Sequence, residues 1–443
     1  MFAVLLGVLL GLQALFTLGI VLGAAVPDGP VVRAIAREIE PDRSWGFPVS
    51  DGVGGRGVPS TDQAILTSGL GQPELNAWER AVVMPRLSTG TPGYEQVMRL
   101  AEGGDLDEEL RGYFRYWAGY TVLTRPVLAV WGIPGMRLLA GVLLSVGAWM
   151  AAREVARRAS ARHVLALGLP LLAGTNILVT PSVSIAHALS FAVTFAGLAL
   201  LARADAAGLR AVLVASVAAA SVYSFMDLLT NPVIPWALSA ALAASLAYRR
   251  TDDVRSLVVH GLSVAVVWPL AWAVTWMSRW ALAVLGLGRE RAWADITGQV
   301  EARMDLEAAG VDGTFGAATW RNARYWWDHL PTAPSLVAVT AVVLVLVAGV
   351  LARRARTQIL PMLLLCSPAL LVPVWYEVFS NHSQIHDYFT YRYLPLALSV
   401  LLLAAATVWE QRPREQPMRP TSEEPAGSGS GAAYSRSGRP RPR

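Results

Sequence analysis

The segment PVWYEVFSNHSQIHDYFTYR, residues 373–392, separates two apolar runs that lie near 358–376 and 393–409. Each run is close to the length of about 20 apolar residues with which a single helix crosses a bilayer. The segment between the runs carries carboxylate, imidazole, amide, phenol and guanidinium groups. These groups are costly in hydrocarbon unless they are paired or solvated, so we interpret the segment as a functional site. The alternative is an ordinary interfacial belt of aromatic and charged anchors.

The composition of the chain extends this interpretation to the whole molecule. It is 54% hydrophobic and 16% charged, with a mean hydropathy of +0.43. These values predict an all-α, polytopic helical membrane protein. The formal charge of +5 comes from Arg without any Lys, and we do not interpret it as a nucleic-acid signal. The single cysteine, Cys366, excludes an intramolecular disulfide. We expect about ten spans, near 2–26, 128–152, 164–181, 187–203, 210–226, 231–248, 256–277, 335–352, 358–376 and 393–409.

Hydrophilic stretches divide the chain further. Residues 1–26 form the first predicted helix, and 27–125 form a large loop subdomain with helical patches near 75–88 and 94–104. Residues 126–410 form the helix bundle, with a second outward loop at 278–334. The tail, 411–443, is rich in Pro, Arg, Gly and Ser and is expected to be disordered. Arg clusters fall in alternate loops, which predicts that both termini and the tail are cytoplasmic and that the two long loops face outward.

Two aspartates are candidate acids or bases on the predicted outer face. Asp62 lies in the sequence STDQAIL and Asp227 in SFMDLLTNP. Spacing alone favours a helix N-cap for Asp62, because Ser, Thr and Asp oxygens satisfy free amides there. Asp227 follows an apolar span and precedes a proline-marked turn, so it is either a wet-cavity carboxylate or a solvated turn residue. Arg279, in the sequence TWMSRW, is a candidate partner for Asp227.

Three further groups of residues are candidates for binding an anion. Arg115 and Tyr116 lie in the aromatic sequence RYWAGY, where guanidinium groups suit either a phosphate or an interfacial belt. His382 and His386 share one face of a helix, since they are four residues apart. Two histidines are a weak signal for a divalent metal, and a phosphate or a proton transfer is the alternative. In the same segment we include Asn381, Tyr391 and Arg392.

Short motifs in this order resemble a family of bacterial polytopic membrane proteins that is similar to the GT-C class of glycosyltransferases. They are STDQAIL, RYWAGY, SFMDLLTNP, TWMSRW and WYEVFSNHSQIHDYFTYR. The resemblance implies a polyprenyl-phosphate-linked sugar donor, an envelope glycan or glycolipid acceptor and a plasma-membrane location. It also implies that the first outward loop supplies an acidic catalytic residue, for which Asp62 is the best match, as a base or a metal ligand.

The resemblance assigns a role to each candidate residue. Asp62 and Asp227 are expected to be catalytic, and the donor phosphate is expected to lie against Arg115, His382, His386 and Arg392. Two other functions share these features: a transporter or flippase of a lipid-linked saccharide, and a non-catalytic envelope-assembly protein. The chain has no Walker loop, no dinucleotide-binding glycine motif and no HExxH sequence, so cytosolic nucleotide chemistry is not expected.

Overall fold

The computed structural model describes residues 1–39, 59–88, 91–106, 110, 112–304, 310–354 and 356–411. The secondary structure in these ranges is helical, which confirms the all-α prediction, and Met1–Gln411 forms one compact unit. The predicted tail lies outside the described residues from Arg412 onward.

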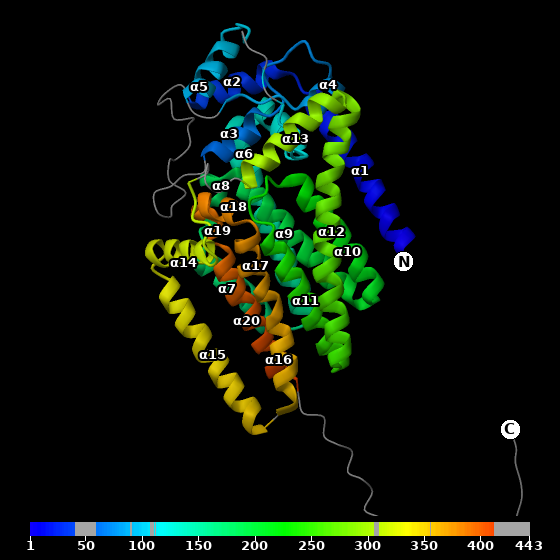
Figure 1. Cartoon of the computed structure of the whole chain (residues 1–443), viewed down its shortest axis with the longest axis vertical. Coiled ribbons are helices and arrows are strands. Elements are labelled where there is room, and N and C mark those ends of the chain that lie inside the picture. Colours follow the sequence, from blue (N-terminus) through cyan, green and yellow to red (C-terminus); the bar gives the residue numbers. More distant parts are fainter. Residues whose placement is uncertain are drawn as a thin grey trace, which may run out of the picture. The chain divides into compact units, whose positions relative to one another are not determined.

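Eight helical segments in the described ranges are long and apolar enough to cross a membrane. A ninth is a bent pair, in which Ala161–Gly174 and Ile177–Val183 meet at 74°. The chain is therefore a multi-pass membrane protein (Figure 1). The eight segments are α1 (Phe2–Ala24), α6 (Thr121–Arg158), α9 with η2 (Ile185–Ala207), α10 (Leu209–Met226), α12 (Val254–Leu287), α15 (Ala333–Arg354), η3 to α17 (Arg356–Val378) and α19 to α20 (Asp387–Glu410).

One of the ten predicted spans, 231–248, corresponds to α11 (Val233–Thr251), a helix that is less apolar than the eight. Most of its side chains are buried, and it packs against α9, α12 and α20. It is rich in Ala and Ser, which allow helices to approach closely but add little hydropathy. One of the ten expected spans is therefore a helix that lies inside the bundle rather than against lipid.

The break in the bent pair separates α7 (Ala161–Gly174) from η1 (Ile177–Val179) and α8 (Thr180–Val183). A broken helix leaves carbonyl groups without intrahelical partners, and these must be satisfied within a membrane protein. Trp326 Nε1 donates to the Gly174 carbonyl at 2.9 Å, and Thr332 Oγ1 donates to the Ala173 carbonyl at 2.6 Å. Side chains from a distant part of the chain therefore stabilise the break.

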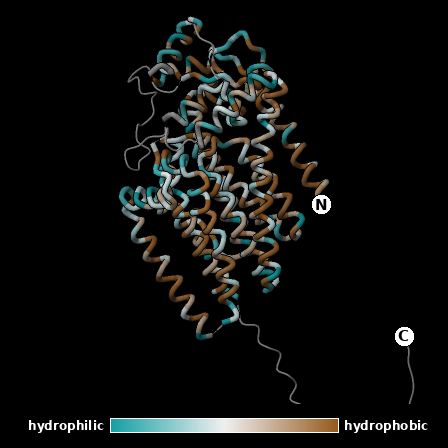
Figure 2. Tube along the Cα trace, viewed as in Figure 1, coloured by the Kyte–Doolittle hydropathy of each residue, from teal (hydrophilic) through white to brown (hydrophobic). Residues whose placement is uncertain are grey.

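The first long loop is a helical subdomain at one end of the bundle. The patches predicted near 75–88 and 94–104 are confirmed as α4 (Ala77–Val83) and α5 (Thr91–Ala101). Two further helices are α2 (Asp28–Ile39) and α3 (Pro59–Thr67). Figure 2 shows hydrophilic segments gathered around α2 and α5, whereas hydrophobic residues dominate long helices such as α15.

A buried arginine ties this subdomain to the first span. Arg125 donates to the Gly23 carbonyl at 2.9 Å and also to the Val26 carbonyl, at the end of α1. It pairs with Asp28 at 2.6 Å, and Asp28 also binds Arg80 at 2.9 Å. Cations near a helix C-terminus stabilise its unpaired carbonyls. Arg125 therefore caps α1.

The second long loop begins later than expected, because α12 continues to Leu287. It contains α13 (Arg289–Met304) and α14 (Ala317–His329). Figure 1 shows α14 at a steep angle to the following α15. Two short helices, α16 (Ile359–Cys366) and α17 (Leu371–Val378), precede α18 (Ser380–Ile385), α19 (Asp387–Thr390) and α20 (Tyr393–Glu410).

Candidate functional site

The beginning of α9 is the centre of the candidate site, because it contacts candidate residues from three other parts of the chain. Asp62 on α3 accepts the Ile185 amide at 2.9 Å and the Ala186 amide at 3.1 Å. Asp62 therefore accepts amides at a helix N-terminus, as an N-cap does. The helix is α9, however, which begins more than a hundred residues further along the chain. A carboxylate is favourable there, because a helix N-terminus carries partial positive charge.

The environment of Asp62 changes its protonation. Its side chain is buried, and burial raises its pKa to about 6, against the lowering effect of the two amides and of the Arg137 guanidinium. The carboxyl is mostly ionised at neutral pH. Each carboxylate oxygen has two lone pairs, so the two amide bonds leave acceptor capacity.

Asp227 reaches the same helix from the turn after α10. One of its carboxylate oxygens accepts the Ser190 hydroxyl of α9 at 2.7 Å, and the other accepts the Thr230 amide at 2.8 Å. The side chain is buried rather than solvated, and burial raises its pKa. Asp227 therefore closes its own turn and fixes that turn to α9.

Arg392 is fully buried between α9 and the break after α7. Its Nε and Nη2 atoms donate to Asn176 Oδ1 at 3.0 and 2.8 Å, and its Nη1 lies 3.0 Å from His187 Nδ1. Tyr391 Oη also donates to Asn176 Oδ1, at 3.3 Å. Within the described residues no carboxylate lies within ion-pair distance of Arg392, and His187 Nε2 is buried without a hydrogen-bond partner.

Three histidines surround the buried Phe389 ring. The ring centroids of His187, His386 and His382 lie 5.1, 5.0 and 5.9 Å from it. His382 and His386 are half-buried, and their own rings are 4.7 Å apart, as their helical spacing predicts. No group of three His, Cys, Asp or Glu side chains suited to a metal occurs among the described residues. The rings of His382 and His386 pack against Phe389 and against each other.

The remaining candidates form a separate cluster between α4 and α12. Arg279 donates to the Tyr116, Ala81 and Val82 carbonyls at 3.1, 3.0 and 2.8 Å. The Arg115 guanidinium lies 5.5 Å from the Tyr116 ring centroid. The idea that Arg279 pairs with Asp227 is wrong, because Asp227 binds Ser190 and Thr230 instead. The contacts that connect Asp62, Asp227 and Arg392 to α9 do not include this cluster.

Three residues of the site were not predicted from the sequence: His187, Phe389, and Asn176 as the acceptor for Arg392. The sequence did contain a signal for His187, because an ionisable side chain next to a long apolar run indicates a functional position. Asn381 of α18 is buried in the same segment. Comparisons of the chain with protein families, with curated proteins and with solved structures found no match.

Proposed function

We propose that this chain is a GT-C-like membrane glycosyltransferase. It transfers a sugar from a polyprenyl-phosphate-linked donor to a cell-envelope glycan or glycolipid on the outer face of a bacterial plasma membrane. The observation that carries the proposal is Arg392, a buried guanidinium whose partners among the described residues are the neutral groups Asn176 and His187. Burial of a cation without a counter-ion is costly, so an anionic ligand is the natural complement of this site.

The leaving group of such a reaction is a lipid phosphate, whose negative charge grows as the glycosidic bond breaks. Arg392 is suited to stabilise that charge, because its guanidinium presents several donors in a fixed plane. The second nitrogen of His187, Nε2, has no hydrogen-bond partner in the part of the chain that the structure describes. Both groups are held by side-chain contacts before any ligand arrives, which lowers the reorganisation needed during the reaction.

The acceptor hydroxyl requires a base. Two carboxylates accept hydrogen bonds from the start of α9: Asp62 from the amides of residues 185 and 186, and Asp227 from the hydroxyl of residue 190. We assign this role to Asp62, because a pKa of about 6 leaves it ionised at neutral pH yet able to accept a proton. Asp227 uses its oxygens in its own turn and in a bond to α9, so we assign it the positioning of that turn.

The test uses purified protein in liposomes with hexose-linked undecaprenyl phosphate as the donor and a bacterial envelope glycolipid extract as the acceptor, and measures release of free undecaprenyl phosphate as the sugar passes to an acceptor hydroxyl. We expect Arg392→Gln and Asp62→Asn each to reduce release about a hundredfold or more, as removal of a charge-stabilising or proton-accepting group does. Arg324→Gln is the matched control, because Arg324 is exposed on α14 and its one bond among the described residues is to Asp328 of its own helix. Full release by both variants, with the fold intact, would contradict the proposal.

A transporter or flippase of a lipid-linked saccharide is the second candidate, and the break between α7 and α8 favours it. Discontinuous helices commonly form the substrate sites of transporters. Asn176 lies at this break and binds Arg392. The same liposomes distinguish the two functions, since a transporter moves the labelled lipid between leaflets without releasing undecaprenyl phosphate.

A further inference from the structure

A polar pocket lies between α2 and α6, apart from the site around α9. Its volume is about 510 Å³, and none of Asp62, Asp227 and Arg392 lines it. Helix α2 packs against α6 and buries an apolar side that includes Val31 and Ile35. The pocket is therefore formed by the polar side of α2 together with the part of α6 beside it.

The wall of the pocket on α6 contains a break in that helix. Gly132 has φ 64° and ψ −164°, a conformation outside the helical region that glycine adopts at low cost. The helix resumes at Ile133 and Pro134, and proline is favoured in the first turn of a helix. All three residues line the pocket. The positive end of the second half of α6 therefore lies at the pocket.

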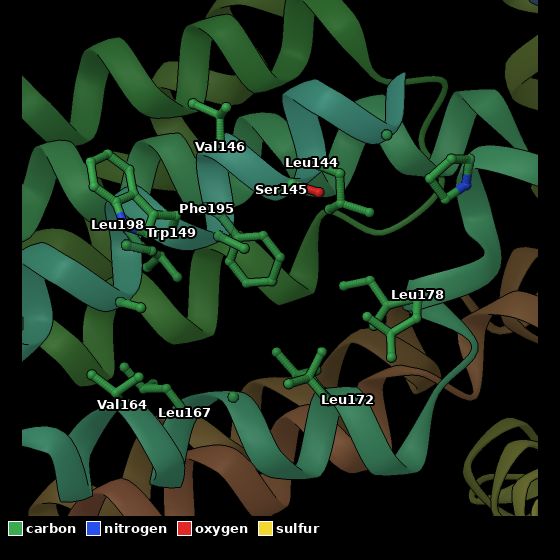
Figure 3. Close-up of a pocket in the computed structure, with 18 of the residues that line it drawn as sticks. Leu144, Ser145, Val146, Trp149, Val164, Leu167, Leu172, Leu178, Phe195 and Leu198 are labelled. Carbon is green, nitrogen blue, oxygen red and sulfur yellow. The ribbon is translucent and has the colours of Figure 1, made fainter. Parts of the chain in front are cut away.

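The pocket lies at one end of the membrane-crossing part of α6. Between residues 138 and 152, α6 lines a mainly apolar groove whose opposite wall includes Leu172 of α7 (Figure 3). A hydrocarbon core about 30 Å thick takes about 20 helical residues, so the crossing part extends back to about residue 133. Trp131, in the pocket wall, is 67% exposed. Tryptophan is enriched at the membrane–water interface, which is where this count places it.

Two arginines of α2 supply the positive charge of the pocket. Arg33 and Arg37 line it, are both exposed, and share one helix face because they are four residues apart. Within the described residues neither guanidinium lies within ion-pair distance of a carboxylate. Glu38 also lines the pocket, which leaves its lining with a net positive charge. Both guanidinium groups therefore have donors available for an anion.

We propose that this pocket binds the head group of an anionic phospholipid, with the phosphate between Arg33 and Arg37 and the acyl chains passing Trp131 into the hydrocarbon. Arginine suits this ligand because its guanidinium forms parallel hydrogen bonds with phosphate oxygens. The start of the second half of α6 adds partial positive charge on the same side. A lipid is the source of the phosphate, because the pocket opens at the depth where lipid phosphates lie. The site is independent of sugar transfer.

The experiment uses the full-length protein in liposomes that contain a photoactivatable lipid with a diazirine near the start of its acyl chain. The lipid has either a phosphatidylglycerol or a phosphatidylcholine head group. After irradiation and digestion, mass spectrometry identifies the labelled peptides. We expect phosphatidylglycerol to label residues 128–134 about fivefold more than phosphatidylcholine does. The double variant Arg33→Gln with Arg37→Gln should abolish that preference.

A charge-matched control separates the pocket from general attraction between the protein and anionic lipid. Arg289→Gln with Arg324→Gln removes the same charge from exposed positions on α13 and α14, and should leave labelling of the pocket unchanged. Ala34→Phe fills the pocket while both arginines remain, and should also abolish the preference. Equal labelling by the two lipids in the unaltered protein would overturn the proposal. Equal losses in the two double variants would overturn it as well.

Competition distinguishes a lipid phosphate from a soluble one. Inorganic phosphate should leave the preference as it is in sodium chloride at the same ionic strength. A loss of preference in phosphate alone would show that the pocket takes a soluble anion, and would overturn the assignment to a lipid. Glu38→Gln should raise the preference, because it removes the one carboxylate among the residues that line the pocket. A fall would contradict selection by charge.

Discussion

Asp62 is a carboxylate whose hydrogen bonds serve a helix other than its own. Its pKa is raised to about 6 in the folded protein, so the folded state binds a proton more tightly than the unfolded chain. The stabilising contribution of this proton is present below about pH 3.8 and is lost as the pH rises through about 6. The difference amounts to about 3 kcal/mol, at about 1.4 kcal/mol for each pKa unit.

We therefore expect the thermal stability of the protein in detergent to fall between about pH 4 and 6, and Asp62→Asn to reduce that slope. Asp253→Asn is the matched control, because Asp253 also accepts two amides at the start of a helix, but at an exposed position. An unchanged slope in Asp62→Asn would show that other groups cause the dependence. Burial also raises the pKa of Asp227, so Asp227→Asn should remove a further part of the slope.

Arg392 depends on Asn176 in a way that a double-mutant cycle can measure. Removal of the Asn176 amide leaves a buried guanidinium without its main acceptor, which costs about 3 kcal/mol or more. We expect Asn176→Ala to lower the resistance to unfolding in sodium dodecyl sulfate much more than the double variant Asn176→Ala with Arg392→Met. Additive effects of the two substitutions would contradict this coupling.

At the scale of helices, apolar runs predicted the spans well because each run is a local property of the chain. Helices α4 and α5 were also predictable, and α4 begins with Asn76 and Glu79 in a reciprocal capping box. The break between α7 and α8 was not predicted. It depends on Trp326 and Thr332, which lie about 150 residues away and satisfy the freed carbonyls. No local pattern encodes that contact.

The Glu377 carboxylate bonds the start of α14 to the bundle. Glu377 of α17 accepts the Gly316 amide and the Thr319 hydroxyl, both at 2.8 Å, at the start of α14. Hydrogen bonds to charged groups contribute about 1.5 to 3 kcal/mol each. We expect Glu377→Ala to speed amide hydrogen exchange in residues 315–322 at least about tenfold, measured by mass spectrometry.

The control for this experiment is Asp328→Ala, at the other end of α14. Asp328 is exposed and pairs with Arg324 one turn earlier, a contact of the kind that adds only a few tenths of a kcal/mol. It should leave exchange near Gly316 unchanged. Equal acceleration by both substitutions would show that α14 unfolds as an isolated helix, without a specific tether at Glu377.

At the scale of the whole molecule, the candidate residues for the site were easier to find than the contacts between them. Asp227 and Arg392 were chosen for residue type and position at predicted span ends, and Asp62, in the first long loop, for its match to the resemblance. All three bond to groups at or next to the first two turns of α9. Arg115 and Arg279 were chosen on the same grounds and belong to another cluster. The position of a residue along a span predicts its depth in the membrane, but it does not predict which helices are neighbours.

The arginine-rich loops do meet at one end of the bundle. Glu410, at the end of α20, binds Arg249 of α11 at 2.7 Å and the Ser160 hydroxyl before α7 at 2.7 Å. Nearby, Arg250 pairs with Asp205 at the end of α9. The positive-inside rule then predicts that this end is cytoplasmic and that the subdomain with α4 is outside.

Labelling of single cysteines tests that orientation. In a Cys366→Ser background, Glu74→Cys introduces an exposed thiol before α4, and Thr357→Cys introduces one after α15. We expect a membrane-impermeant maleimide to label the first variant in intact cells and the second only after permeabilisation. The opposite pattern would place Asp62 and Arg392 on the cytoplasmic side, where nucleotide sugars are present. A polyprenyl-phosphate donor would then no longer be required, and the proposed glycosyltransferase reaction would lose its physical basis.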